Sequence, residues 1–105
     1  MDMCLITISG TCVTNPNTLP SGRVSFILEF KYSEQQEKPD KVIVMAEKGA
    51  VTTIPQVGDY VVIANAKYYD DTRAGAKFGA FAQMPGTVNV AAHFDGVIPA
   101  EKLLK

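Results

Sequence analysis

The sequence predicts an all-β fold, a small barrel of five strands with a short helical segment between the third and the fourth. Apolar and polar residues alternate along several short runs, which is the pattern of half-buried strands. Clusters rich in Pro, Gly, Asn and Asp separate these runs and allow the chain to turn. With 105 residues, of which 47% are hydrophobic, the chain suits one folded domain. We therefore expect a single domain over residues 1–105, with residues 95–105 as a C-terminal tail.

The first two strands are predicted at residues 4–14 and 24–32. Residues 15–22 lie between them and are rich in Asn, Pro, Ser and Gly, so the chain should reverse direction there. The second run has the clearest alternation, and every other residue of it should face the core. The expected core residues of this run and of the later strands are Phe26, Leu28, Phe30, Tyr32, Val44 and Tyr60.

The later strands are predicted at residues 42–46, 60–69, 78–84 and 87–92. Pro85 and Gly86 separate the last two runs, which form either one interrupted strand or a pair of strands. Val51 and Ile54 lie three residues apart in a segment bounded by Gly and Pro, and this spacing predicts a single helical turn. Five short strands with a helical turn after the third are the element order of the OB-fold, a partly open Greek-key barrel. An SH3-like barrel and a small sandwich are alternatives, but neither explains the helical turn.

The strand at residues 60–69 cannot keep one regular alternation. Strict alternation would turn Lys67 toward the core on the same side as Val61 and Ile63. Asn65 tolerates the left-handed conformation of a bulge, so we expect the register to change there. The bulge should turn Ala66 and Tyr68 inward and Lys67 and Tyr69 outward.

Three stretches carry a family resemblance: "LITISGTCVTNP", "PSGRVSFILEF" and "VGDYVVIANAKYYDD". In the first, an apolar strand contains a Gly and leads to a short link with Pro; in the third, Gly-Asp opens a run of Val and Ile that enters a long loop. These stretches resemble the first, second and fourth strands of bacterial single-stranded DNA-binding proteins and of their shorter relative, primosomal replication protein B. The resemblance implies an OB-fold that binds single-stranded DNA, favoured over RNA, during replication, repair or recombination.

Three features depart from that family, and one of them is the acidic hairpin tip at residues 33–40. The chain ends in "PAEKLLK", whereas the longer members end in an acidic peptide that recruits partners, so we do not expect that recruitment here. It contains no Trp, a frequent stacking residue in the family, although Tyr and Phe can also stack on bases.

Single-stranded nucleic acid is bound by cations that contact phosphates and by aromatic rings that stack on bases. The loop at residues 70–77 carries both kinds of residue at or beside its ends. The candidate nucleic-acid-binding residues are Arg23, Lys31, Lys67, Tyr69, Arg73, Lys77 and Phe78. In the alternative interpretation, the barrel core contains Tyr68, Phe78 and Phe81. Arg73 and Lys77 are then solvent-exposed charges that only make the hairpin soluble. The hairpin tip at residues 33–40 is acidic and should not be the main contact.

The charge balance limits the kind of interface. There are 10 Lys and Arg against 11 Asp and Glu, so any nucleic-acid site must be a local patch on a chain of net charge -1. One such domain would bind weakly, so we expect a homodimer or a homotetramer, which would join patches and cover the open edge of the barrel. The competing interpretations are a protein-interaction or assembly module without nucleic-acid binding, and a small ligand-binding or enzymatic barrel.

No catalytic or metal-binding pattern is present in the sequence. There is no phosphate-binding loop and no nucleophile elbow, and His93 is the single histidine, without partners at ligand spacing. We therefore expect no enzyme activity, no cofactor and no metal. The start of the chain lacks the features of an export signal and no run is long and apolar enough to span a membrane, so we expect a soluble, cytoplasmic protein. Cys4 and Cys12 lie too far apart along one strand for a disulfide.

Overall fold

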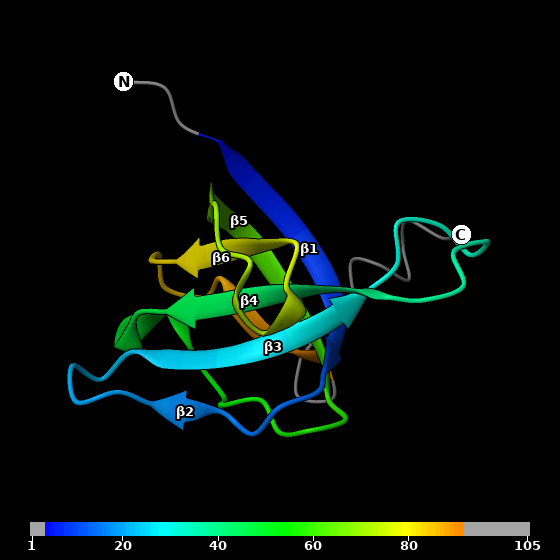
Figure 1. Cartoon of the computed structure of the whole chain (residues 1–105). Helices are drawn as coiled ribbons and strands as arrows, with labels where there is room; N and C mark the ends of the chain where they lie inside the picture. The colour runs from blue at the N-terminus through cyan, green and yellow to red at the C-terminus, as the bar shows by residue number, and fades with distance from the viewer. Residues whose placement is uncertain (1–3, 92–105) are drawn as a thin grey trace.

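The computed structural model describes residues 4–91 of the chain, and the predicted tail and His93 lie outside these residues. The strands are β1 (Leu5–Cys12), β2 (Asn17–Thr18), β3 (Val24–Phe30), β4 (Asp40–Ala46), β5 (Tyr60–Tyr69), β6 (Phe78–Ala82) and β7 (Val88–Val90) (Figure 1). Two single 3-10 turns, η1 (Lys48–Ala50) and η2 (Arg73–Gly75), are the helical elements of this part of the chain.

Five of the strands close a barrel in the order β1-β3-β4-β6-β5 and back to β1. All neighbours are antiparallel except β4 and β6, which are parallel. The short strands β2 and β7 pair with β3 and β5 outside this ring. Figure 1 shows β3 and β4 side by side across one wall of the barrel, with β1 and β5 behind them. This connectivity confirms the predicted OB-fold.

The interior is filled by alternate side chains of each strand, as the sequence pattern predicts. Phe26, Leu28, Val44 and Ile63 are 0–2% exposed and form the centre of one hydrophobic cluster. Gly10 of β1 lies so close to β3 that a Cβ there would collide with the carbonyl oxygen of Glu29. The close contact lets β1 complete the barrel wall.

Two predicted core residues are in fact exposed. Tyr32 is 66% exposed because it lies two residues beyond the end of β3, where the alternation continues in the sequence but the sheet does not. Tyr60 is 41% exposed and its hydroxyl donates a hydrogen bond to Oγ of Ser9 at 2.8 Å. Each tyrosine therefore belongs to the surface.

The predicted helical turn lies between β4 and β5 but a few residues earlier than expected. The turn is η1, in which the N–H of Ala50 donates to the carbonyl of Glu47 at 2.9 Å. Val51 instead forms an isolated bridge with Val88. The run of β-branched residues that starts at Val51 disfavours helix and explains the difference.

The predicted bulge in β5 is confirmed. Asn65 has φ 57°, and the pairing with β1 changes register there, from Ala66 opposite Ile6 to Ile63 opposite Ile8. Ala66 is fully buried, as expected. Tyr68 follows Ala66 in the alternation but is 43% exposed, so the expectation that it lies inside is wrong. Phe78 is packed against the core, and the Tyr68 ring lies on it from outside.

Candidate nucleic-acid interface

The seven predicted binding residues are divided between two hollows that share one wall, Tyr68. The outer-face hollow is lined by Arg23, Met45, Lys67, Tyr68, Tyr69, Arg73 and Phe81. The barrel-mouth hollow is lined by residues 6–9 of β1 together with Phe30, Lys31, Tyr32, Tyr68, Lys77 and Phe78. The structure thus brings together Arg23, Lys67, Tyr69 and Arg73 in one place and Lys31, Lys77 and Phe78 in another.

The floor of the outer-face hollow is built by sheet register. Phe81 of β6 lies between Met45 of β4 and Lys67 of β5, and the inward alternation of Ala80 and Ala82 turns the Phe81 ring outward. Tyr69 lies next to this row, and its ring covers Gly79, where a Cβ would collide with it. The absence of a side chain at Gly79 therefore leaves room for the Tyr69 ring against the sheet.

Arg23 places a cation over this floor. Its guanidinium carbon lies 5.2 Å from the centroid of the Phe81 ring, within the range of a cation–π contact. Its Nη2 atom lies 3.1 Å from Oε1 of Glu47, which orients the guanidinium. The Arg23 side chain remains 44% exposed, so it is accessible to a phosphate.

Arg73 is held by Asp71 in the loop between β5 and β6. The Asp71 carboxylate accepts hydrogen bonds from Nε (3.0 Å), Nη2 (2.7 Å) and the backbone N–H (3.1 Å) of Arg73. Hydrogen bonding to Arg73 lowers the pKa of Asp71, and the same contact raises the pKa of Arg73. The Asp71 side chain is 6% exposed and that of Arg73 is 74% exposed, so the acid is covered while the guanidinium faces outward.

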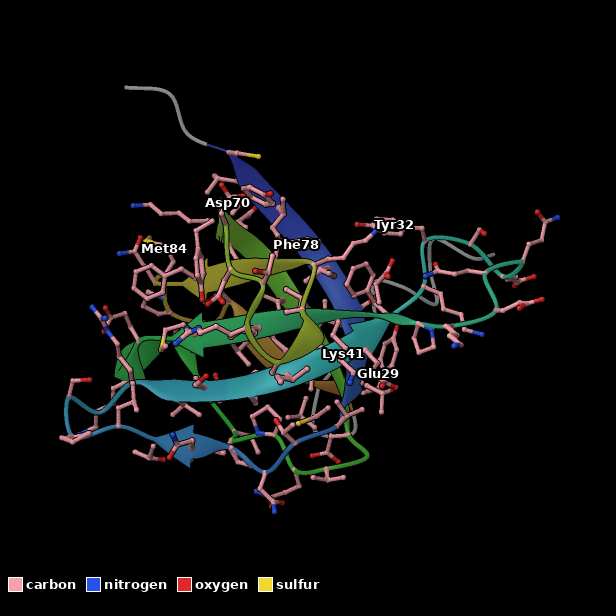
Figure 2. The ribbon with its side chains drawn as sticks, in the orientation of Figure 1. Glu29, Tyr32, Lys41, Asp70, Phe78 and Met84 are labelled. Atoms are coloured by element: carbon pink, nitrogen blue, oxygen red, sulfur yellow. The ribbon has the colours of Figure 1, made fainter. Side chains whose placement is uncertain are left out.

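A chain of aromatic rings closes the barrel mouth. The ring centroids lie 5.1 Å apart from Tyr32 to Phe30, 5.8 Å from Phe30 to Phe78 and 5.4 Å from Phe78 to Tyr68. Figure 2 shows Phe78 at the start of β6 and Tyr32 where the chain leaves β3, with Asp70 at the end of β5. The inner members pack on the core, while Tyr32 and Tyr68 present exposed rings.

Polar contacts orient the edge of this mouth. The Tyr68 hydroxyl donates to Oδ1 of Asp70 at 3.0 Å, and this hydrogen bond raises the pKa of Tyr68. The Lys77 ammonium lies 5.9 Å from the centroid of the Tyr32 ring and 3.9 Å from Oδ2 of Asp40. At 59% exposure, the Lys77 side chain is open to solvent.

The sequence-based predictions did not include several residues that line the hollows, among them the large side chains Tyr32, Met45, Tyr68 and Phe81. The alternation around Phe81 could have identified it, because small Ala residues on both sides occupy the inward positions. The same argument applies to Met45, between the inward Val44 and Ala46. Nothing local indicates that these two side chains meet, because parallel pairing of β4 with β6 brings them together.

Two other kinds of feature are absent from residues 4–91. No helix in this range has the length and hydropathy to cross a membrane. In the same part of the chain, no group of three or more His, Cys, Asp or Glu side chains is arranged to hold a metal ion.

Comparison with known proteins identifies a structural neighbour. No family model and no curated protein sequence matches the chain. The crystal structure of the small single-stranded DNA-binding protein from Streptomyces coelicolor is similar, with a TM-score of 0.54 and 18% sequence identity. The match covers 91% of this chain and 100% of that one. This chain therefore shares its fold with that single-stranded DNA-binding protein.

Proposed function

We propose that this protein binds single-stranded DNA in replication, repair or recombination. It would do so with little sequence preference and without catalysing a reaction. The observation that carries the proposal is the outer-face hollow, which three cations line together with partly exposed aromatic rings. Arg23 lies over Phe81, Lys67 pairs with Phe81 across the sheet, and Arg73 projects from the loop beside them. The fold shared with the Streptomyces coelicolor protein adds support, since that protein is described as binding single-stranded DNA.

The composition of the hollow matches the two needs of a single strand. Aromatic rings accept any base, with about 1 to 3 kcal/mol for each stacked base. Guanidinium and ammonium groups contact phosphates and displace counterions, which makes binding weaker as salt rises. Every DNA base has a face that can stack and every nucleotide carries a phosphate, so the expected preference for particular DNA sequences is small.

We further propose that the protein acts as a homodimer or homotetramer and prefers DNA to RNA. With a net charge of -1, a single chain has no long-range attraction to nucleic acid, and joining several patches would raise the affinity through effective concentration. Size-exclusion chromatography with light-scattering detection gives the mass of the assembly. A competition between oligothymidine and oligouridine gives the preference for sugar type.

The proposal is tested by fluorescence anisotropy of a labelled oligothymidine of about 35 nucleotides, long enough for several OB-fold sites. We expect binding that weakens with salt and exceeds binding to a duplex of the same length. A folded protein that leaves the single strand unbound at low salt would contradict the proposal.

The alternative is a protein-interaction module that kept the barrel without nucleic-acid binding. The observation in its favour is the acidic hairpin tip, where Glu34, Glu37 and Asp40 accompany a net charge of -1. Absence of DNA binding, with the barrel intact, would favour this module.

A further inference from the structure

We propose that the ion pair between Arg23 and Glu47 covers part of the Phe81 ring in the free protein, and that a bound nucleotide opens this cover. A phosphate would take the place of the Glu47 carboxylate on the Arg23 guanidinium, and a base would take the uncovered face of the ring. Glu47 would thereby limit the affinity of the outer-face hollow for DNA. The inference rests on the proposed function, because it concerns how the same site admits a nucleotide.

Strand pairing brings the two members of the cover together. Val24, the first residue of β3, pairs with Ala46, the last residue of β4. Arg23 precedes the first of these residues and Glu47 follows the second, so the two side chains leave the sheet at adjacent strand ends. The backbone N–H of Glu47 donates to the carbonyl of the residue after Phe81 at 2.9 Å. The backbone therefore places the ion pair beside the Phe81 ring.

The Arg23 guanidinium occupies part of the ring face that a base would need. Its central carbon lies 5.2 Å from the centroid of Phe81, a partly exposed ring of the outer-face hollow. Guanidinium groups and bases both bind to aromatic faces, so they compete for the same surface. Arg23 must therefore change its contact with the ring when a base stacks there.

The contact between Arg23 and Glu47 is open to exchange. A single carboxylate oxygen, Oε1 of Glu47, accepts from Nε of Arg23 at 3.2 Å and lies 3.1 Å from Nη2. Both side chains are more than a third exposed, so water and salt weaken the ion pair. A phosphate offers the guanidinium more than one charged oxygen, in a geometry that suits two parallel hydrogen bonds. We therefore expect a phosphate to replace the Glu47 carboxylate.

The ion pair of Arg73, which lines the same hollow, is built differently. Both carboxylate oxygens of Asp71 accept hydrogen bonds from the Arg73 guanidinium, and Oδ1 also accepts from the Arg73 backbone N–H. The Asp71 side chain is covered, whereas that of Glu47 is not. Asp71 should therefore remain on its arginine when DNA binds, while Glu47 should leave. The two carboxylates thus have opposite effects on binding, because one supports its guanidinium and the other competes for it.

The variant Glu47→Gln tests the exchange. It removes the charge but keeps the size of the side chain, and the exposed position predicts a melting temperature near that of the native protein. We expect the affinity for an oligothymidine of about 12 nucleotides to rise about threefold, mainly through slower dissociation. Anisotropy titration and stopped-flow measurement of release give the two quantities. Glu37→Gln removes the same charge from the exposed hairpin tip, outside the outer-face hollow, and is the matched control.

The outcomes of this comparison separate three causes. Weaker binding by Glu47→Gln would show that Glu47 supports its arginine, as Asp71 does, and would overturn the proposal. An equal gain in Glu37→Gln would also overturn it, because the effect would then come from net charge. In an Arg23→Ala background, Glu47→Gln should gain no more than Glu37→Gln does, because the guanidinium is absent. An undiminished gain in that background would overturn the exchange.

Nuclear magnetic resonance of the full chain observes the cover directly. A proton over an aromatic ring resonates at lower frequency, so the Nε–H proton of Arg23 should be shifted in the free protein and unshifted in Phe81→Leu. Saturating oligothymidine should remove the shift in the native protein. A shift that persists with DNA bound would overturn the opening of the cover and leave the proposed function intact. A folded protein that binds no oligothymidine would overturn both.

Discussion

The two hollows differ in how their cations are held. In the outer-face hollow, Arg23 and Arg73 are oriented by the carboxylates of Glu47 and Asp71, over a floor of paired strands. In the barrel-mouth hollow, Lys77 has a long contact to Asp40 and stands beside the exposed ring of Tyr32. Oriented guanidinium groups lose less freedom when they bind than flexible ammonium groups do. We therefore expect the outer-face hollow to contribute most of the affinity.

The largest effect should come from Phe81→Ala. The substitution removes a ring that lines the outer-face hollow and is the cation–π partner of Arg23. We expect affinity for oligothymidine to fall by about 1 to 3 kcal/mol, at every oligonucleotide length. Anisotropy titration measures the loss, and Phe81→Tyr serves as the control because it keeps a stacking ring. Native affinity in Phe81→Ala would show that the strand avoids the outer-face hollow.

Removal of one cation from each hollow should have the next largest effect. Changing both Arg73 and Lys77 to Ala eliminates up to two ion pairs with phosphates. The plot of log affinity against log salt should become less steep by about 0.7 for each phosphate that is no longer neutralised. The control replaces Lys38 and Lys48, two exposed cations outside both hollows. An unchanged slope in the first variant would mean that neither Arg73 nor Lys77 binds a phosphate.

For Asp71→Asn we expect a smaller change in DNA affinity, and its direction is informative. If Asp71 only neutralises the charge of Arg73, removing the carboxylate should strengthen DNA binding. We expect the opposite, a loss of about threefold, because a neutral amide cannot hold the guanidinium of Arg73 through a charge-assisted pair. Glu37→Gln on the hairpin tip removes the same charge without touching Arg73 and is the matched control.

A double-variant comparison shows whether Asp71 acts through Arg73. In an Arg73→Ala background, Asp71→Asn should have no further weakening effect, because the group that it positions is absent. Additive losses would mean that Asp71 stabilises the loop independently of Arg73.

The sequence predicts the strands better than it predicts the hollows. The bounds of β5 and its bulge at Asn65 were predictable because a lysine on the core side of a regular strand conflicts with burial. Tyr32 was misplaced because alternation continues past the end of β3, and no local signal marks where the sheet ends. The contact of Met45 with Phe81 depends on parallel pairing between β4 and β6, which are separated by more than thirty residues. Such long-range pairing is set by the closure of the barrel, which local patterns do not describe.

The smallest expected effect concerns the wall between the hollows. Tyr68→Phe keeps the ring but loses the hydrogen bond to Asp70, and an exposed hydrogen bond of this kind contributes about 1 kcal/mol or less. We expect the affinity for oligothymidine to fall by about threefold at most. Tyr68→Ala removes the wall itself and should lower the affinity further.

The comparison of these two Tyr68 variants distinguishes two roles for the residue. If the ring is a fixed surface on which a base stacks, most of the loss should appear only when the ring is removed. If Tyr68→Phe loses as much as Tyr68→Ala, the hydroxyl itself contacts the DNA, in place of its contact with Asp70. The strand would then be held at the wall by a polar contact instead of by stacking.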